Sequence, residues 1–162
     1  MAQTNTKYEF VPGDEITLPG TNHTAKRIRA LVAIPMFNVS PGDLGGYIED
    51  MKNLSMDDNA WVSGNAWVTG EARVYGDAIV SGTAEVSGNA WVYDEARVFG
   101  DAWVTDNARV YGNGVVTGEA EVSGCARICG RARISSKAQV SGNAMVSGFI
   151  VVCGNEIMSG TA

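Results

Sequence analysis

The chain has 162 residues and a formal net charge of −6, and 45% of its residues are hydrophobic. That apolar content is enough for a buried core, and the acidic excess disfavours general binding to nucleic-acid backbones. The 20 glycines follow no collagen-like triplet, which favours an internal repeat over disorder. No apolar stretch approaches the length of a membrane span, and no signal-peptide core is present at the N-terminus.

Residues 1–52 are predicted to form a small antiparallel β domain. Three turn signals, Pro12-Gly13-Asp14, Pro19-Gly20 and Pro41-Gly42-Asp43, separate the extended segments KYEFV, EITL and AKRIRALVAIPMF. We expect three or four strands that act as a lid, because the repeats that follow would otherwise expose apolar core and unpaired backbone. In the connecting segment, Leu54 and Met56 are predicted at the two inward positions of an imperfect first repeat.

Residues 53–162 are assigned to a repeat domain. From Asn59 to Gly160 the chain reads as 17 consecutive hexads such as NAWVSG, without insertion or deletion. Position two is Ala in 14 hexads, position four is Val in 14, and position six is Gly in 14, with Asp94, Asp106 and Ser136 as the substitutes. Positions two and four point the same way in an extended chain and are both apolar, so they are predicted to face the core.

A corner every six residues is predicted at position six, where glycine permits a left-handed backbone torsion. Three sides then give a coil of 18 residues, and Tyr75, Tyr93 and Tyr111 support that count because they lie 18 residues apart. The sequence therefore predicts an all-β fold, a triangular β-solenoid of five to six coils behind the N-terminal lid.

Sorting the hexads by three assigns the outward third positions to three faces. We call them face one (Trp61, Ile79, Arg97, Val115, Arg133 and Val151), face two (Trp67, Glu85, Trp103, Glu121 and Gln139) and face three (Arg73, Trp91, Arg109 and Arg127). The three tyrosines belong to face three at position five.

The V-S-G-N-A-W pattern resembles the left-handed parallel β-helix of hexapeptide-repeat proteins. The combination of RIRAL, V-x-x-GDLGGYIE and NLS-x-x-x-NAWV is similar to a family of small proteins encoded by bacteriophages and prophages, which has no well-established activity. This resemblance covers essentially the whole chain and implies an origin and an architecture, with the cytoplasm of a bacterial host as the expected location.

Catalysis is not expected. Acyltransferases with this fold generally use a histidine base and a loop that protrudes from a coil, whereas the single His23 precedes the repeats and no coil carries an insertion. One histidine cannot form a three-histidine zinc site, and Cys125, Cys129 and Cys153 have neither CxxC spacing nor a histidine nearby in sequence. No cofactor, metal or disulfide is predicted.

Candidate binding residues lie on face three, where arginines could hold phosphate or carboxylate and aromatic rings could hold a base. The candidate ligand- or partner-binding residues are Arg73, Tyr75, Trp91, Tyr93, Arg109, Tyr111 and Arg127. The candidate oligomer-interface residues are the outward Trp61, Trp67 and Trp103, with Phe149, Ile150 and Ile157 in the degraded last coil. A homo-oligomer is expected, with a trimer favoured.

Three functions remain open at this point. The first is a non-enzymatic binding or scaffold protein that interferes with a host process, by binding a host protein or by sequestering an anionic, nucleotide-like ligand. The second is a structural part of a virion or fibre, in which the rod acts as a spacer. The third is a degenerate hexapeptide acyltransferase.

Overall fold

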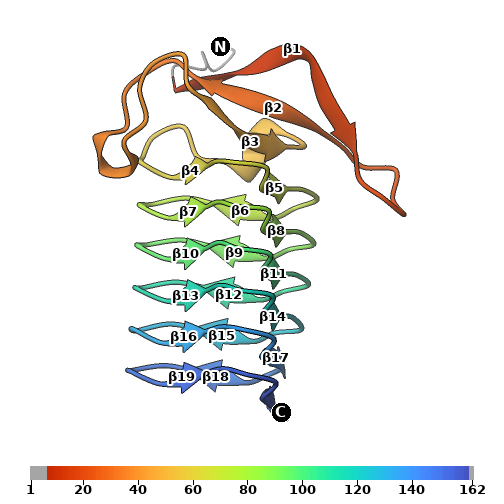
Figure 1. Cartoon of the computed structure of the whole chain (residues 1–162), viewed down its shortest axis with the longest axis vertical. Coiled ribbons are helices and arrows are strands. Elements are labelled where there is room, and N and C mark those ends of the chain that lie inside the picture. Colours follow the sequence, from red (N-terminus) through yellow and green to blue (C-terminus); the bar gives the residue numbers. More distant parts are fainter. Residues whose placement is uncertain (1–6, 161–162) are drawn as a thin grey trace.

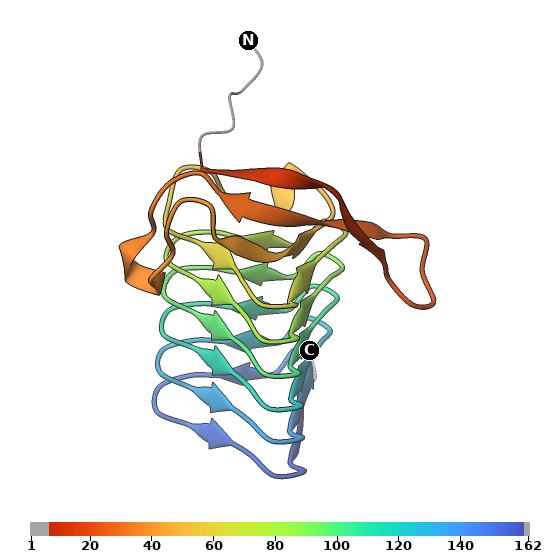
Figure 2. The same ribbon diagram turned by 45° about the horizontal axis from the view of Figure 1, so that its top comes forward.

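The structure is a computed structural model that describes residues 7–160. Its N-terminal part contains three strands, β1 (Tyr8–Thr17), β2 (Thr24–Ala30) and β3 (Leu44–Ile48), and two short 3-10 helices, η1 (Pro35–Phe37) and η2 (Met51–Asn53). Below them the chain winds into a rod of stacked triangular coils (Figures 1 and 2). No helix in the range 7–160 is long and apolar enough to cross a membrane.

Each face of the rod is a parallel sheet whose neighbouring strands come from successive coils. Face one is formed by β4 (Trp61–Val62), β7 (Ile79–Val80), β10 (Arg97–Val98), β13 (Val115–Val116), β16 (Arg133–Ile134) and β19 (Val151–Val152). Face two is formed by β5 (Trp67–Val68), β8 (Glu85–Val86), β11 (Trp103–Val104), β14 (Glu121–Val122), β17 (Gln139–Gly142) and β20 (Ile157–Gly160). Face three is formed by β6 (Arg73–Val74), β9 (Trp91–Val92), β12 (Arg109–Val110), β15 (Arg127–Ile128) and β18 (Met145–Val146).

The predicted six-residue frame is confirmed. Every Ala at position two and every Val at position four is buried from Ala60 to Val152, and residues 18 apart pair in register, as Arg97 does with Val115. The corners have the predicted left-handed torsion: Asp94 and Asp106 have φ of 58° and Ser136 has φ of 59°. The Asp94 and Asp106 carboxylates also accept hydrogen bonds from backbone N–H groups one coil below.

The lid continues face two. Strand β1 pairs antiparallel with β2, β2 pairs antiparallel with β3, and β3 pairs in parallel with β5, so nine strands form one sheet. The parallel stack thus begins at β3, ahead of residue 53. Adjacent Gly45 and Gly46 permit this close approach, because a Cβ on Gly46 would lie 2.5 Å from the Ala66 carbonyl oxygen.

Three details of the N-terminal part differ from the sequence-based expectation. The Pro12-Gly13 signal does not end a strand, since β1 passes through it with a register shift against β2 between Phe10 and Glu15. The long segment predicted after Thr24 is a strand only as far as Ala30, where the chain turns toward η1. Leu54 and Met56 both pack against the core as predicted, but Leu54 bridges Val74 and so takes a position-four site rather than position two.

The prediction that Trp61 lies on an outward surface available to another subunit is wrong. Its side chain is 1% exposed, because the lid covers this part of face one. The contact is close enough that a Cβ on Gly45 would lie 2.8 Å from the Trp61 ring. Phe149, Ile150 and Ile157 are exposed at the last described coil, as the sequence predicts.

The frame predicts the effect of a core substitution. Changing Val104→Ala removes two methyl groups from a fully buried side chain and should lower the free energy of unfolding by about 1–3 kcal/mol. The neighbouring Trp103 is 53% exposed, so Trp103→Ala should cost less. Chemical denaturation of both variants measures this, and a larger loss for Trp103→Ala would contradict the frame.

Candidate functional site

Face three carries an aromatic ladder. Tyr75 and Tyr93 stack with ring centroids 4.9 Å apart and an interplanar angle of 2°, and Tyr93 and Tyr111 stack at 5.1 Å and 3°. Trp91 lies beside the ladder and meets Tyr75 and Tyr93 edge-on, at 6.2 Å and 6.4 Å. The 18-residue coil produces this ladder because it returns position five to the same face at each turn. The stacking means that the inner rings cover one another.

The arginines of face three lie along the ladder. Arg73 and Arg109 flank Trp91 in register, and the Arg109 guanidinium lies 4.6 Å from the centroid of the Trp91 ring. Arg109 pairs in register with Arg127 on the other side, which places two like charges on adjacent strands. Within residues 7–160, none of these three arginines forms an ion pair; those found there involve Lys7, His23, Arg27, Arg29, Lys52 and Lys137.

Two carboxylates at the corners beside face three bind groups other than the arginines. Glu71 accepts a hydrogen bond of 2.6 Å from Lys52, and Asp94 accepts one of 3.1 Å from the Gly112 N–H. No ion pair between a face-three arginine and a corner carboxylate is found in the described part of the chain. Their positive charge is therefore not neutralised by a carboxylate there, although the Arg109 guanidinium lies over the Trp91 ring.

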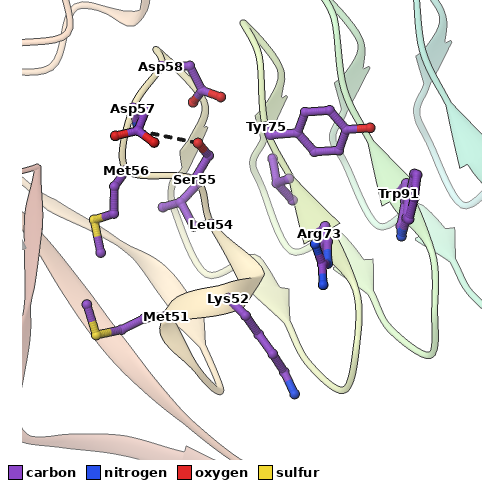
Figure 3. Close-up of a pocket in the computed structure, with 11 residues that line it drawn as sticks. Met51, Lys52, Leu54, Ser55, Met56, Asp57, Asp58, Arg73, Tyr75 and Trp91 are labelled. Atoms are coloured by element: carbon purple, nitrogen blue, oxygen red, sulfur yellow. Dashed lines mark hydrogen bonds between the residues drawn. The ribbon is translucent and has the colours of Figure 1, made fainter. Parts of the chain in front are cut away.

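A cavity of about 440 Å³ lies where the ladder ends at the lid (Figure 3). Ser55 takes the ladder position above Tyr75, because its N–H bonds to the Val74 carbonyl oxygen as position-five residues do elsewhere. Its small side chain leaves the upper ring position empty. The cavity is lined by Met51, Lys52, Leu54, Ser55, Met56, Asp57, Asp58, Arg73, Val74, Tyr75 and Trp91.

The wall opposite Tyr75 is held in place by Asp58 and Lys7. The Lys7 ammonium donates to the Ser55 carbonyl oxygen at 2.7 Å and to the Asp58 carboxylate at 3.4 Å. Asp58 also accepts hydrogen bonds from the N–H groups of Ala60 and Gly76. This network fixes the loop at the distance from Tyr75 that keeps the cavity open.

A second hollow, of about 290 Å³, continues from the cavity along face three. The two share Arg73 and Trp91, and the second adds Arg109, the amide side chains of Asn89 and Asn107, and the Glu71 carboxylate, which is bonded to Lys52. The structure thus brings Arg73, Tyr75 and Trp91 to one cavity and extends the surface to Arg109. Tyr93 lies within the ladder, whereas Tyr111 and Arg127 lie farther down the rod and line neither hollow.

The sequence did not indicate the loop residues Lys52, Ser55 and Asp57. Their contribution depends on a first coil two residues longer than the rest, since Leu54 pairs with Val74 across 20 positions. The turn-forming sequence after Asn53 is the only signal that could have located this irregularity. The remaining candidate residues lie elsewhere: Trp67 and Trp103 are on face two, half-buried and exposed respectively.

Within residues 7–160, the side chains that could act in catalysis or bind a metal do not form a cluster. In the described range, no group of three or more His, Cys, Asp or Glu side chains could hold a metal ion. Cys125 and Cys153 are exposed, and Cys129 is buried beside Tyr111, whose pKa it raises. His23 lies 2.7 Å from Glu49, and neither lines the face-three cavity.

One coil of the chain matches the model of a known protein family. A family model described as the YdcK beta solenoid repeat matches residues 138–155, the span from β17 to the end of β19. The match is one coil long, so the chain is similar to that repeat and is a β-solenoid repeat protein. No curated protein sequence matches the chain.

The tyrosine ladder predicts how the ionisation of its phenol groups depends on pH. Burial raises the pKa of Tyr75 and of Tyr93 above the ordinary value of 10.0, while Arg109 acts in the opposite direction on both. The protonated ring is therefore favoured by folding. This contribution to stability is fully present below pH 10 and is lost as the pH rises through the higher native pKa values.

Ultraviolet titration of phenolate absorbance should show ladder tyrosines ionising above pH 10 in the native protein. Arg109→Ala removes a nearby positive charge, so the pKa of Tyr93 should rise further. The matched change Arg97→Ala on face one should leave it unaltered. Ionisation of the ladder at or below the ordinary value would contradict this account.

Proposed function

We propose that this chain is a non-enzymatic binding protein that holds a small planar anion of the nucleotide type on face three. The phage or prophage origin suggested by the sequence motifs fits a protein that interferes with a host process by sequestering such a ligand. The observation that carries the proposal is the pairing of an unfilled ring position above Tyr75 with arginines that lack carboxylate partners in the described chain.

The ring of the ligand would extend the tyrosine ladder. Stacked aromatic rings expose a face only at the ends of a ladder, and the upper face of Tyr75 borders the 440 Å³ cavity. Base–aromatic stacking contributes about 1–3 kcal/mol. Asp57 lines the same cavity and offers a carboxylate that can accept hydrogen bonds from ring N–H groups.

The anionic group would lie at the arginines. From a ring above Tyr75, the groove leads along Arg73 and Trp91 to Arg109, and the planar donors of the two arginines match the oxygens of a phosphate. An anion there would also relieve the repulsion between the adjacent Arg109 and Arg127. The combined size of the two hollows is ordinary for a small-ligand site.

The non-enzymatic character is supported by what surrounds the site. The residues that line the two hollows include no histidine and no cysteine. His23 is engaged with Glu49 on another part of the molecule. Incorporation of labelled acetyl groups from acetyl-coenzyme A into an acceptor would contradict this part of the proposal.

Calorimetric titration with a panel of nucleoside 5′-monophosphates tests the site. The double variant Arg73→Ala/Arg109→Ala should weaken binding at least about tenfold, since each charge-assisted hydrogen bond contributes about 1.5–3 kcal/mol. Ser55→Phe should abolish binding by filling the ring position above Tyr75. Arg97→Ala/Arg133→Ala on face one is the matched control and should bind normally.

Two outcomes would overturn the proposal. One is the absence of binding for every member of the panel at millimolar concentration. The other is equal affinity in the native protein, the Ser55→Phe variant and the Arg73→Ala/Arg109→Ala variant, which would place the ligand elsewhere.

Self-association of the rods is a second candidate, favoured by the complementarity of faces two and three. In a closed ring of parallel copies, each residue meets one at the same height on its neighbour, because the symmetry axis runs along the rods. Coil by coil the facing pairs would be Trp67 with Arg73, Glu85 with Trp91, Trp103 with Arg109, and Glu121 with Arg127. The two tryptophan–arginine pairs would be cation–π contacts, and Glu121 with Arg127 would be an ion pair. Glu85 with Trp91 would be a packing contact without charge pairing.

The double variant Arg109→Ala/Tyr93→Ala separates the two candidates. If face three is an assembly interface, the mass measured by light scattering should fall to that of a single chain. If face three is a ligand site, the mass should stay the same and the nucleotide affinity should fall. A double variant that retains both properties would contradict both candidates.

A further inference from the structure

The hairpin of β1 and β2 overhangs face two. Figure 1 shows its tip projecting beyond the rod on the side of β5 and β8. A hollow of about 540 Å³ lies between the hairpin and this face. The hairpin contributes Leu18, Pro19, Thr21 and His23, and the rod contributes Trp67, Thr69, Gly70, Glu85, Ser87, Gly88 and Trp103.

The rod side of the hollow places one carboxylate between two indole rings. Trp67, Glu85 and Trp103 come from three consecutive strands and pair in register. Two strand spacings separate the tryptophan positions, or about 9.6 Å. A cation held between the rings would lie about 5 Å from each, within the ~6 Å over which a ring attracts a cation.

The charge around the hollow favours a cation. Glu85 and the next acidic residue down the face, Glu121, form no ion pair within residues 7–160. No lysine or arginine lines the hollow. His23 lines it but bonds to Glu49 at 2.7 Å, and Glu49 also accepts from the Gly70 N–H.

Other ligand classes fit less well. An anion would meet Glu85 without a compensating cation, and a neutral apolar group would bury that carboxylate unpaired. A metal ion would find one carboxylate and a few neutral hydroxyls, and no group of three or more His, Cys, Asp or Glu side chains in residues 7–160 could hold one. An organic cation uses both features, since its alkyl groups contact the rings and its charge is balanced by Glu85.

A second observation concerns the indole N–H of Trp67. It is the one side-chain polar atom found to be buried without a hydrogen-bond partner in the described chain. Such a donor is costly to leave unsatisfied. It belongs to a residue that lines the hollow, but the nitrogen itself is covered by protein, so the ligand would contact the Trp67 ring rather than this donor.

We propose that this hollow binds an alkylated ammonium ion of the trimethylammonium type. The site lies on a different face from the nucleotide-type site and does not depend on it. The same chemistry is carried by a free amine such as choline and by a trimethylated lysine side chain.

The test compares choline with its neutral isostere 3,3-dimethylbutan-1-ol, using the indole N–H signals of the folded protein in NMR titrations. Choline should shift the signals of Trp67 and Trp103, and the isostere should bind at least about tenfold more weakly. Trp103→Ala and Glu85→Gln should each reduce choline binding at least about fivefold. Trp91→Ala on face three is the matched control and should bind choline normally.

A peptide with trimethyllysine, compared with its unmethylated form, shows whether a side chain can supply the ion. Tighter binding of that peptide than of choline identifies a protein source, and tighter binding of choline identifies a free amine. Variants whose thermal midpoint matches the native protein ensure that lost binding is not lost folding.

Three results would overturn the proposal. The first is equal affinity for choline and its isostere, which would mean that the charge is not recognised. The second is the absence of any shift at about 50 mM choline, far above the range of a specific site. The third is unchanged choline binding in both the Trp103→Ala and Glu85→Gln variants, which would place the ion elsewhere.

Discussion

The corner at position six is the constraint on which the rest of this molecule depends. A left-handed torsion every six residues closes each coil at 18 residues, and equal coil length brings like positions into register. The core consists almost entirely of alanine and valine because only small side chains fit the narrow triangular prism. The same register determines the outer surface, where any residue type that recurs at 18-residue spacing becomes a ladder. Extra residues must therefore leave the frame for the ladders to keep their register, as the two added between Leu54 and Val62 do.

The sequence predicted the structure correctly within the repeats, where the six-residue periodicity determines which side chains are buried. The burial of Val104 beside an exposed Trp103, and the alignment of Tyr75 with Tyr93, follow from counting residues. Prediction failed where tertiary contacts override the local pattern. Trp61 occupies an outward position in its hexad, but β3 crosses over it, and the path of β3 depends on pairing with distant β5. The bulge at Gly13 has the same turn residues as a hairpin loop, and only the partner strand distinguishes the two.

The candidate sites could likewise be predicted from the sequence only where they consist of repeat residues. Arg73 and Tyr75 could be assigned to one face from the repeat, whereas the cavity above them could not be anticipated. It exists because the first coil is two residues longer and because the small Ser55 stands where a ring would otherwise continue the ladder. The hollow beside Trp67 likewise requires the β1–β2 hairpin to extend past the rod, and neither strand carries a signal for that path.

A regular ladder has little binding capacity in its middle. The face of Tyr93 is covered on both sides by its neighbours, and the indole of Trp91 is already in contact with Arg109. Another ring can therefore stack only at an end of the ladder. Both hollows discussed above lie at the junction of lid and rod, one above Tyr75 and one beside Trp67. The rod supplies rigid, evenly spaced side chains, and the lid supplies the walls that convert two open faces into concave sites. Because the lid segments that form these walls are separate, one a loop after η2 and the other the β1–β2 hairpin, the two proposed sites would take ligands of opposite charge within the same small protein.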